Sequence, residues 1–419
     1  MIAKFFNIPR ELAYLCLLIF VLFSATIGYQ INSISIILLL AFYLIDKNLF
    51  LKVKSLSNKV VYFYLIYFVI HLLGLLRTEN MSEGSSEVTV KLAFLIIPII
   101  IATEKLSNRY LYYLFVTFKY WLLAYALFLI YHKLLVIGGP LFTLPVISLY
   151  RLTGIHHAYF TLFYMFSLFF VFHQIKTKQI SSLLGYFQVI FLFFFISILG
   201  ARIMFGVALV ITIIFLSKNI IQLKGLKKLS LFLAIILVIF FIYKKTDVSE
   251  KFNRLSKIEW NIDKNIYNHQ VFSFDYNEST SNTFEIRLIK WYCASQIIKD
   301  NLFLGVGTGD YGDMLLSKYY EIDFKKGMVY GYNTHNQYIE EFLKFGIFGG
   351  LFFICFILYI LYQAIKTSNY ILLCSIITVS AFMLVESIFE RQHGVVFFTL
   401  FLSLAYLYDQ SKKTLKENH

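Results

Sequence analysis

The residue best suited to acid–base chemistry is His335, in the stretch Asn333-Thr334-His335-Asn336-Gln337-Tyr338 that leads into a long apolar run. A neutral imidazole titrates near pH 6.5 and can take a proton from a hydroxyl group. Helix capping alone could explain Asn333 or Thr334 at this position, but it does not explain a histidine. We therefore predict that His335 is a general base and that the two asparagines line its cavity.

Two arginines are the best candidates for binding an anion. Arg202 follows Gly200-Ala201 between two apolar runs, and Arg287 lies one helical turn before Trp291, so that a helix would place Arg287 and Trp291 on one face. Guanidinium groups bind phosphate oxygens bidentately. The alternatives are snorkelling of Arg202 to lipid headgroups and a surface cation–π pair between Arg287 and Trp291.

Further polar side chains lie at the ends of other apolar runs. His156 and His157 open one run, and Glu386, Glu390, Arg391 and His393 gather at the turn between the last two. We predict that they line the same cavity, with simple interfacial anchoring as the alternative. The sequence shows no D-x-D or H-E-x-x-H pattern, so we expect neither a metal site nor a cofactor.

The glycine-rich stretch 305–311, Gly-Val-Gly-Thr-Gly-Asp-Tyr, resembles a phosphate-binding loop only superficially. It lacks the preceding strand and the lysine of a P-loop. We interpret it as a tight turn that folds the surrounding loop back over the membrane.

The elements that must position these residues are hydrophobic helices. Apolar residues make up 59% of the chain, the mean hydropathy is +0.71, and the apolar runs have the length of membrane-spanning helices rather than of barrel strands. We predict an all-α polytopic membrane protein with about twelve transmembrane helices, the first of them retained. The runs fall at 12–28, 31–46, 59–76, 88–103, 110–132, 156–173, 181–199, 202–217, 227–243, 338–364, 369–388 and 392–408.

The distribution of basic residues predicts the topology. Lys and Arg gather in alternate connections, which places both termini in the cytoplasm and the long connection outside. We therefore divide the chain into helices 1–9 (1–243), a large periplasmic loop (244–337), and helices 10–12 with a cytoplasmic tail (338–419). The basic residues of the cytoplasmic connections account for the net charge of +14. We therefore expect membrane lipids as partners and no nucleic acid.

Within the predicted loop, the segment 285–299 has apolar residues at near-helical spacing. Ile286, Ile289, Cys293 and Ile297 form one side, with Lys290 elsewhere around the helix. We predict an amphipathic helix that lies on the membrane surface. The four cysteines form no C-x-x-C pair, so neither a disulfide framework nor a zinc site is expected.

The order of these motifs resembles the O-antigen ligase and polymerase superfamily. An arginine after the seventh span, an Arg-x-x-x-Trp helix late in the loop, the glycine turn, and Asn-Thr-His-Asn-Gln-Tyr with downstream glycines follow one another over 180–360. The resemblance implies a GT-C-like fold and a glycan donor carried on undecaprenyl diphosphate. It also implies an acceptor that is a lipid A-core sugar in ligases, a carrier-linked repeat in polymerases, or a protein in some relatives. Here Gly-Ala-Arg replaces the serine-arginine version common in the family.

This resemblance agrees with the chemistry of the residues. Arg202 and Arg287 would hold the diphosphate and His335 would deprotonate the acceptor hydroxyl, giving a single displacement with inversion and without metal. Among the enzyme readings we favour the ligase. The alternative outside the enzymes is a transporter or flippase. For that class we would expect charges deep inside several spans and helices broken by Gly or Pro. Apart from Lys119, we expect the spans to be nearly free of charge.

Overall fold

The structure is a computed structural model that describes residues 9–46, 48–54, 56, 59–104, 106–137, 150, 153–220, 258–270 and 283–408. All regular secondary structure in these residues is helical. The main helices of the bundle are α2 (Arg10–Ser24), α3 (Tyr29–Leu44), α5 (Lys59–Gly74), α6 (Met81–Thr103), α7 (Asn108–His132), α9 (His157–Lys176), α10 (Ser182–Leu199), α11 (Arg202–Ile220), α18 (Gln337–Lys366), α19 (Tyr370–Met383) and α20 (Gln392–Val396), which continues as η4 (Phe397–Phe401). The short α4 (Leu49–Lys54) lies between α3 and α5.

The bundle has the dimensions of a multi-pass membrane protein, which confirms the predicted fold class. Six helices in the described part of the chain are long and apolar enough to cross a membrane, and shorter apolar helices accompany them. Each predicted span within the described residues coincides with an apolar helix. The predicted span 227–243 lies outside the described residues, so the total of about twelve spans stays a prediction.

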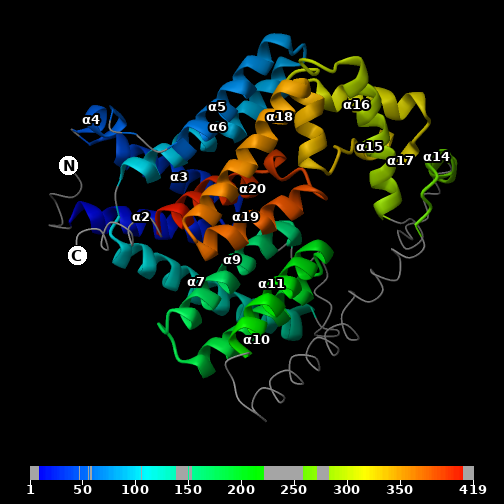
Figure 1. Ribbon diagram of the computed structural model, residues 1–419. Coiled ribbons are helices and arrows are strands. Elements are labelled where there is room, and N and C mark those ends of the chain that lie inside the picture. The colour runs from blue at the N-terminus through cyan, green and yellow to red at the C-terminus, as the bar shows by residue number, and fades with distance from the viewer. Residues whose placement is uncertain are drawn as a thin grey trace.

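Helix α9 is the centre of the bundle. It packs against α7, α10, α11 and α19, and almost all of its side chains are buried, including a series of phenylalanines such as Phe163, Phe166 and Phe170. A helix that is apolar on all sides must be surrounded by other helices or by lipid. Because α9 begins at His157, its surroundings fix the position of the two histidines at its start (Figure 1).

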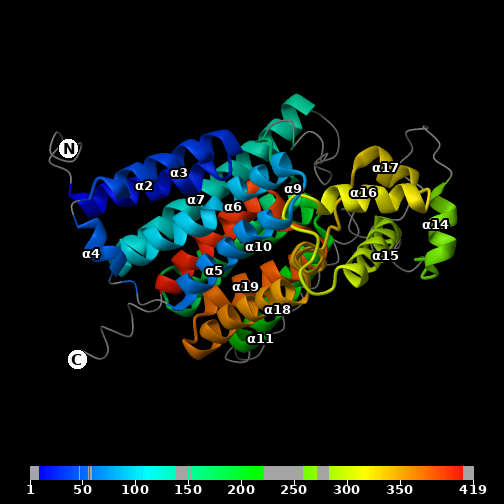
Figure 2. The same ribbon diagram turned by 90° about the horizontal axis from the view of Figure 1, so that it is seen from above.

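The large loop folds into helices α14 (Ile262–Gln270), α15 (Thr283–Asp300), α16 (Tyr311–Glu321) and α17 (Lys325–Tyr330). They gather at one end of the bundle, away from α4 (Figure 2). They share a second hydrophobic core in which Ile289 and Cys293 of α15 meet Leu315, Phe324 and Leu343.

The predicted helix at 285–299 is therefore present as α15, but its predicted contact with the membrane surface is wrong. Ile289, Cys293 and Ile297 are covered by the other loop helices and by the start of α18, so this apolar face is not available to lipid. Lys290, expected away from the apolar face, is buried as well, with 2% of its surface exposed.

Helix α18 is interrupted at Gly346, whose φ of 62° and ψ of −158° are not helical. The glycine turn of the loop replaces the missing backbone hydrogen bonds. Val306 N donates to Leu343 O at 3.0 Å, Gly307 N donates to Lys344 O at 3.0 Å, and Ile347 N donates to Leu302 O at 2.7 Å. Gly305 also has a positive φ, and a Cβ there would lie 2.4 Å from the Lys344 carbonyl. Only glycine fits this close approach.

The expectation that the spans are nearly free of charge apart from Lys119 is wrong. Lys119 is indeed buried, where its Nζ donates to Gln174 and Gln188. Helices α6 and α18, however, also carry buried charged side chains, namely Glu87, Lys91, Glu340, Glu341 and Lys344. They could not be recognised as buried because each lies near the end of an apolar run, where a charged side chain usually reaches water.

Candidate active site

Two connections at the loop end of the bundle bring His335 and Glu386 together. His335 lies just before α18 and Glu386 follows α19, and His335 Nδ1 is 3.1 Å from Glu386 Oε2. Tyr159 of α9 donates its hydroxyl to Glu386 Oε1 at 3.5 Å. With Nδ1 directed at the carboxylate, the other ring nitrogen of His335, Nε2, is left to accept a proton.

The electrostatics of this pair suit a base and its orienting carboxylate. Burial lowers the pKa of His335; the hydrogen bond that the imidazole donates to Glu386 partly opposes this shift, and the charges of Lys290 and Arg287 reinforce it. Burial of Glu386 works against its ionisation, but His335, His156 and Arg287 outweigh it and lower its pKa to about 2. At neutral pH the carboxylate is therefore ionised and the imidazole is neutral.

The polar residues around His335 fix its backbone. His335 has a φ of 47°, which non-glycine residues rarely adopt, and its N–H donates to Asn333 Oδ1 at 3.1 Å. Asn336 caps α18 by accepting from Ile339 N, and its amide donates to Leu384 O near Glu386. Asn333 and Asn336 therefore have a structural role in addition to the predicted role of lining the cavity.

Trp291 also contacts this motif. Its indole N–H donates to Thr334 O at 3.0 Å, which joins α15 to the residue before His335. The sequence placed Trp291 beside Arg287 on one face of the helix. In the structure the indole supports the histidine motif from the loop side.

Cationic side chains gather around the His335–Glu386 pair. The charges of Glu386 and Arg202 both act on Arg287, whose pKa is lowered mainly by burial. Within the described residues Arg287 Nε is buried without a hydrogen-bond partner. Lys290 lies one turn further along α15, 4.7 Å above the ring of Tyr332. Burial, with the charge of Arg287, lowers the pKa of Lys290 to about 7.

The other predicted residues approach from α9 and from the last connection. The rings of His156 and His157 are tilted by 47° with centroids 4.2 Å apart. Burial lowers the pKa of His156, with Glu386 opposing and Arg391 and His335 reinforcing the shift. Arg391 is exposed at the end of the short helix η3 (Ile388–Glu390). The structure therefore brings His156, Arg287 and His335 together around a single carboxylate, Glu386, from three separate parts of the chain.

Sequence reasoning missed Lys290 as a member of this site. Its spacing of three residues from Arg287 was the available signal, because residues three apart are neighbours on a helix. Next to the site lies a group that we call the buried ion cluster: Glu87, Lys91, Glu340, Lys344 and Glu390. Glu390 was predicted to line the cavity, whereas sequence reasoning missed the other four. The i, i+4 spacing of Glu87 with Lys91 and of Glu340 with Lys344 was the signal there.

Comparison with known proteins finds a family model that matches part of the chain. Residues 157–354 match the family model described as O-antigen ligase, which confirms the resemblance seen in the sequence. This segment contains Arg202, Arg287 and His335, whereas Glu386 lies beyond it. No curated protein sequence matches the chain. The match supports a membrane glycosyltransferase of the O-antigen ligase and polymerase type.

Proposed function

We propose, starting from the O-antigen ligase match of residues 157–354, that the protein transfers a glycan from undecaprenyl diphosphate to a lipid A-core sugar. The reaction takes place at the periplasmic face of a bacterial inner membrane, with both termini in the cytoplasm. The observation that carries this proposal is the His335–Glu386 pair, with the cationic side chains of Arg287 and Lys290 close to it.

The proposed chemistry is a single displacement. The acceptor hydroxyl oxygen attacks the anomeric carbon while His335 Nε2 takes its proton, and the bond from that carbon to the diphosphate oxygen breaks with the electron pair leaving on the diphosphate. Glu386 orients the imidazole and stabilises its protonated form. One displacement at the anomeric carbon inverts its configuration.

Arg202 and Arg287 bind the diphosphate in this proposal. Two phosphate groups bring negative charge into a partly buried site, where fixed guanidinium groups stabilise a leaving group far better than water does. The buried Nε of Arg287, which has no hydrogen-bond partner in the described parts of the chain, is one donor available for that purpose. We expect this charge stabilisation to replace a metal ion, so that transfer is metal-independent.

Three other functions remain to be separated by experiment. A polymerase would join carrier-linked repeat units, and a protein O-oligosaccharyltransferase would use a protein acceptor, both with the same donor and the same base. A polysaccharide flippase would use none of this chemistry. The interrupted α18 is a feature expected of transporters, but here its freed carbonyl groups of Leu343 and Lys344 are bound by the glycine turn rather than left for a cargo.

The decisive experiment is deletion of the gene in its host and complementation with wild type, His335→Ala or His173→Ala at matched membrane expression. His173 is a control because it lies at the opposite end of α9. Gels of lipopolysaccharide and of carrier-linked glycan report the result. A bare core with long glycan stranded on the carrier, rescued by wild type and His173→Ala but not by His335→Ala, is expected.

Other outcomes assign the alternatives. A core that bears a single repeat identifies a polymerase, and normal lipopolysaccharide with loss of protein-bound glycan identifies a protein glycosyltransferase. Full rescue by His335→Ala would show that His335 is not the base and would favour transport as the function.

A further inference from the structure

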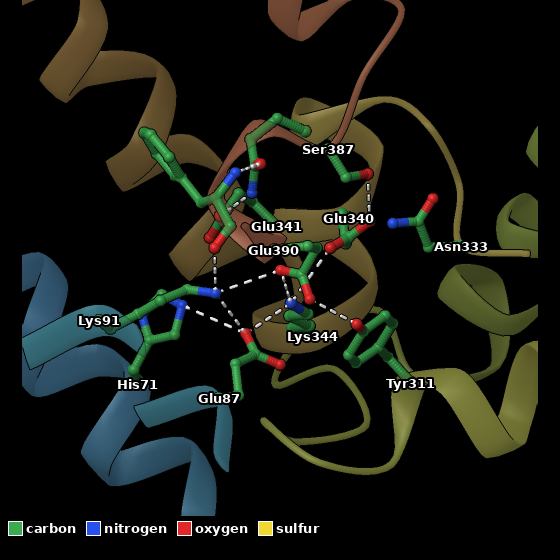
Figure 3. Close-up of polar contacts among 12 residues, drawn as sticks. His71, Glu87, Lys91, Tyr311, Asn333, Glu340, Glu341, Lys344, Ser387 and Glu390 are labelled. Atoms are coloured by element: carbon green, nitrogen blue, oxygen red, sulfur yellow. Dashed lines mark hydrogen bonds and ion pairs between the residues drawn. The ribbon is translucent and has the colours of Figure 1, made fainter. Parts of the chain in front are cut away.

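Figure 3 shows the buried ion cluster, which joins three parts of the chain, α6, α18 and η3. Lys344 of α18 is 2.6 Å from Glu87 of α6, 2.7 Å from Glu390 of η3 and 3.2 Å from Glu340 one turn earlier in α18. Lys91 of α6 is 3.1 Å from Glu87 and 3.2 Å from Glu390. Each ammonium group therefore lies between carboxylates on different elements.

Most of this cluster is withdrawn from solvent. Glu340 and Lys344 have no measurable side-chain exposure, and Lys91 has none either. Tyr311 of the loop closes one side, with its hydroxyl 2.5 Å from Glu390 Oε2 and its ring 4.0 Å from Lys344 Nζ. A buried ion network of this kind has a defined geometry because each member must keep its partners.

Glu340 is the member that reaches the candidate site. Its Oε2 accepts from Thr334 Oγ1 at 3.0 Å and from Ser387 Oγ. Thr334 directly precedes His335, and Ser387 directly follows Glu386. One carboxylate thus holds the neighbours of both members of the pair, while its other oxygen faces Lys344.

The two connections need such a restraint. His335 has a positive φ that is costly for a histidine, so its neighbours must hold it there. Thr334 Oγ1 is also 3.3 Å from Ser387 Oγ and accepts from Asn336 N at 3.2 Å. Without an acceptor at Glu340, the hydroxyl groups of Thr334 and Ser387 could form hydrogen bonds only with each other and with nearby backbone groups.

We propose that Glu340 is a positioning residue for this reaction: through Thr334 and Ser387 it holds His335 and Glu386 at hydrogen-bonding distance, and Lys344 is its counter-ion. This inference rests on the proposed function, because it concerns the same proton transfer. Glu340 does not touch the reacting atoms. It acts through the two connections on the geometry of the base.

The test is Glu340→Gln beside a matched control, Glu341→Gln. An amide offers one acceptor oxygen where the carboxylate serves two hydroxyl groups and Lys344, so Glu340→Gln must lose part of the arrangement. Glu341 is the adjacent residue and is equally buried, but it binds Tyr67 and Gln337 instead. Both variants and the wild type are purified as full chains in detergent and compared for expression and thermal unfolding.

Steady-state transfer from a synthetic undecaprenyl-diphosphate glycan to core lipopolysaccharide supplies the readout. Glu340→Gln is expected to lower kcat by about 100-fold, because a displacement of the base by about 1 Å has that effect. The KM for the donor stays unchanged, since Arg202 and Arg287 are untouched. Glu341→Gln stays close to wild type in both parameters.

A second variant protects the test against misfolding of the first. Thr334→Val with Ser387→Ala removes both donors and leaves every charge of the cluster in place, so it should reproduce the fall in kcat. Equal kcat in Glu340→Gln and Glu341→Gln, or an effect confined to KM, would overturn the positioning role alone. Absence of transfer by the wild type would overturn the proposed function and this inference with it.

Discussion

The candidate site and the buried ion cluster are neighbours with opposite electrostatic character. In the cluster, lysines and glutamates alternate, so that each charge has an opposite charge within 3.2 Å. In the site, Arg287 and Lys290 lie near one carboxylate, Glu386, and the buried Nε of Arg287 has no hydrogen-bond partner within the described residues. The comparison separates charges that are paired with one another from charges that we propose bind an anionic ligand.

The largest effect should come from Lys344→Met. This change removes the ammonium that three carboxylates share and leaves them buried against one another, which lowers the free energy of unfolding by about 3–5 kcal/mol. Thermal unfolding in detergent measures it. Lys366→Met, at the exposed far end of the same helix, serves as the control. Equal thermal stability of the two variants would mean that the cluster is not a structural ion network.

Arg287→Gln should have the reverse profile. We expect kcat/KM to fall by about 100-fold because a donor to the leaving diphosphate is lost. Thermal stability should be unchanged or higher, because the change removes a partly buried guanidinium that has no ion pair among the described residues. Kinetics and unfolding of one preparation report both quantities. A clear loss of stability would show that Arg287 belongs to a structural network after all.

Glu386→Gln should have a smaller effect on rate and a distinctive effect on pH dependence. The carboxylate opposes the depression of the pKa of His335, so its removal lowers that pKa further. The base is active when deprotonated, so the rate rises with pH through this pKa, and the acid limb of kcat/KM should move to lower pH. The weaker base should lower kcat by about 10-fold. An acid limb that does not move would exclude Glu386 as the partner of the base.

Lys290→Met should have the smallest effect. With a pKa of about 7, Lys290 is mostly charged below pH 7, where its loss should raise the donor KM by about 5-fold or less, the range of a single modest ion pair. Above pH 7 the wild type must take up a proton to offer the same charge, so the difference between variant and wild type should shrink. Lys299→Met, exposed on the same helix, is the control.

The spans could be predicted from the sequence because the thickness of the bilayer fixes their length. Polar caps then define several starts: Ser107, Ser181 and Asn369 each accept a backbone N–H in the first turn of α7, α10 and α19. These are local signals, so they survive in a single sequence. The motif around His335 could be predicted for the same reason, because its residue types are suited to acid–base chemistry.

The partners of the buried charges could not be predicted in this way. The contact of Lys344 with Glu87 depends on α18 lying beside α6, residues that are far apart in the chain. The burial of Lys290 depends on Tyr332 and the start of α18 covering a helix face that amphipathic spacing marks as polar. The spacing of apolar residues reveals which side of a helix is apolar. It does not reveal whether other parts of the chain also cover the polar side.

The break at Gly346 divides α18 into two segments that pack in different surroundings. The outer length, 337–345, shares backbone hydrogen bonds with the glycine turn through Leu343 and Lys344, while the helix as a whole packs against α5 and α19. A local opening of the turn would therefore release the amides of the outer length with it. In amide hydrogen exchange, 301–309 and 337–345 form one cooperative unit, and 347–366 exchanges separately with the bundle.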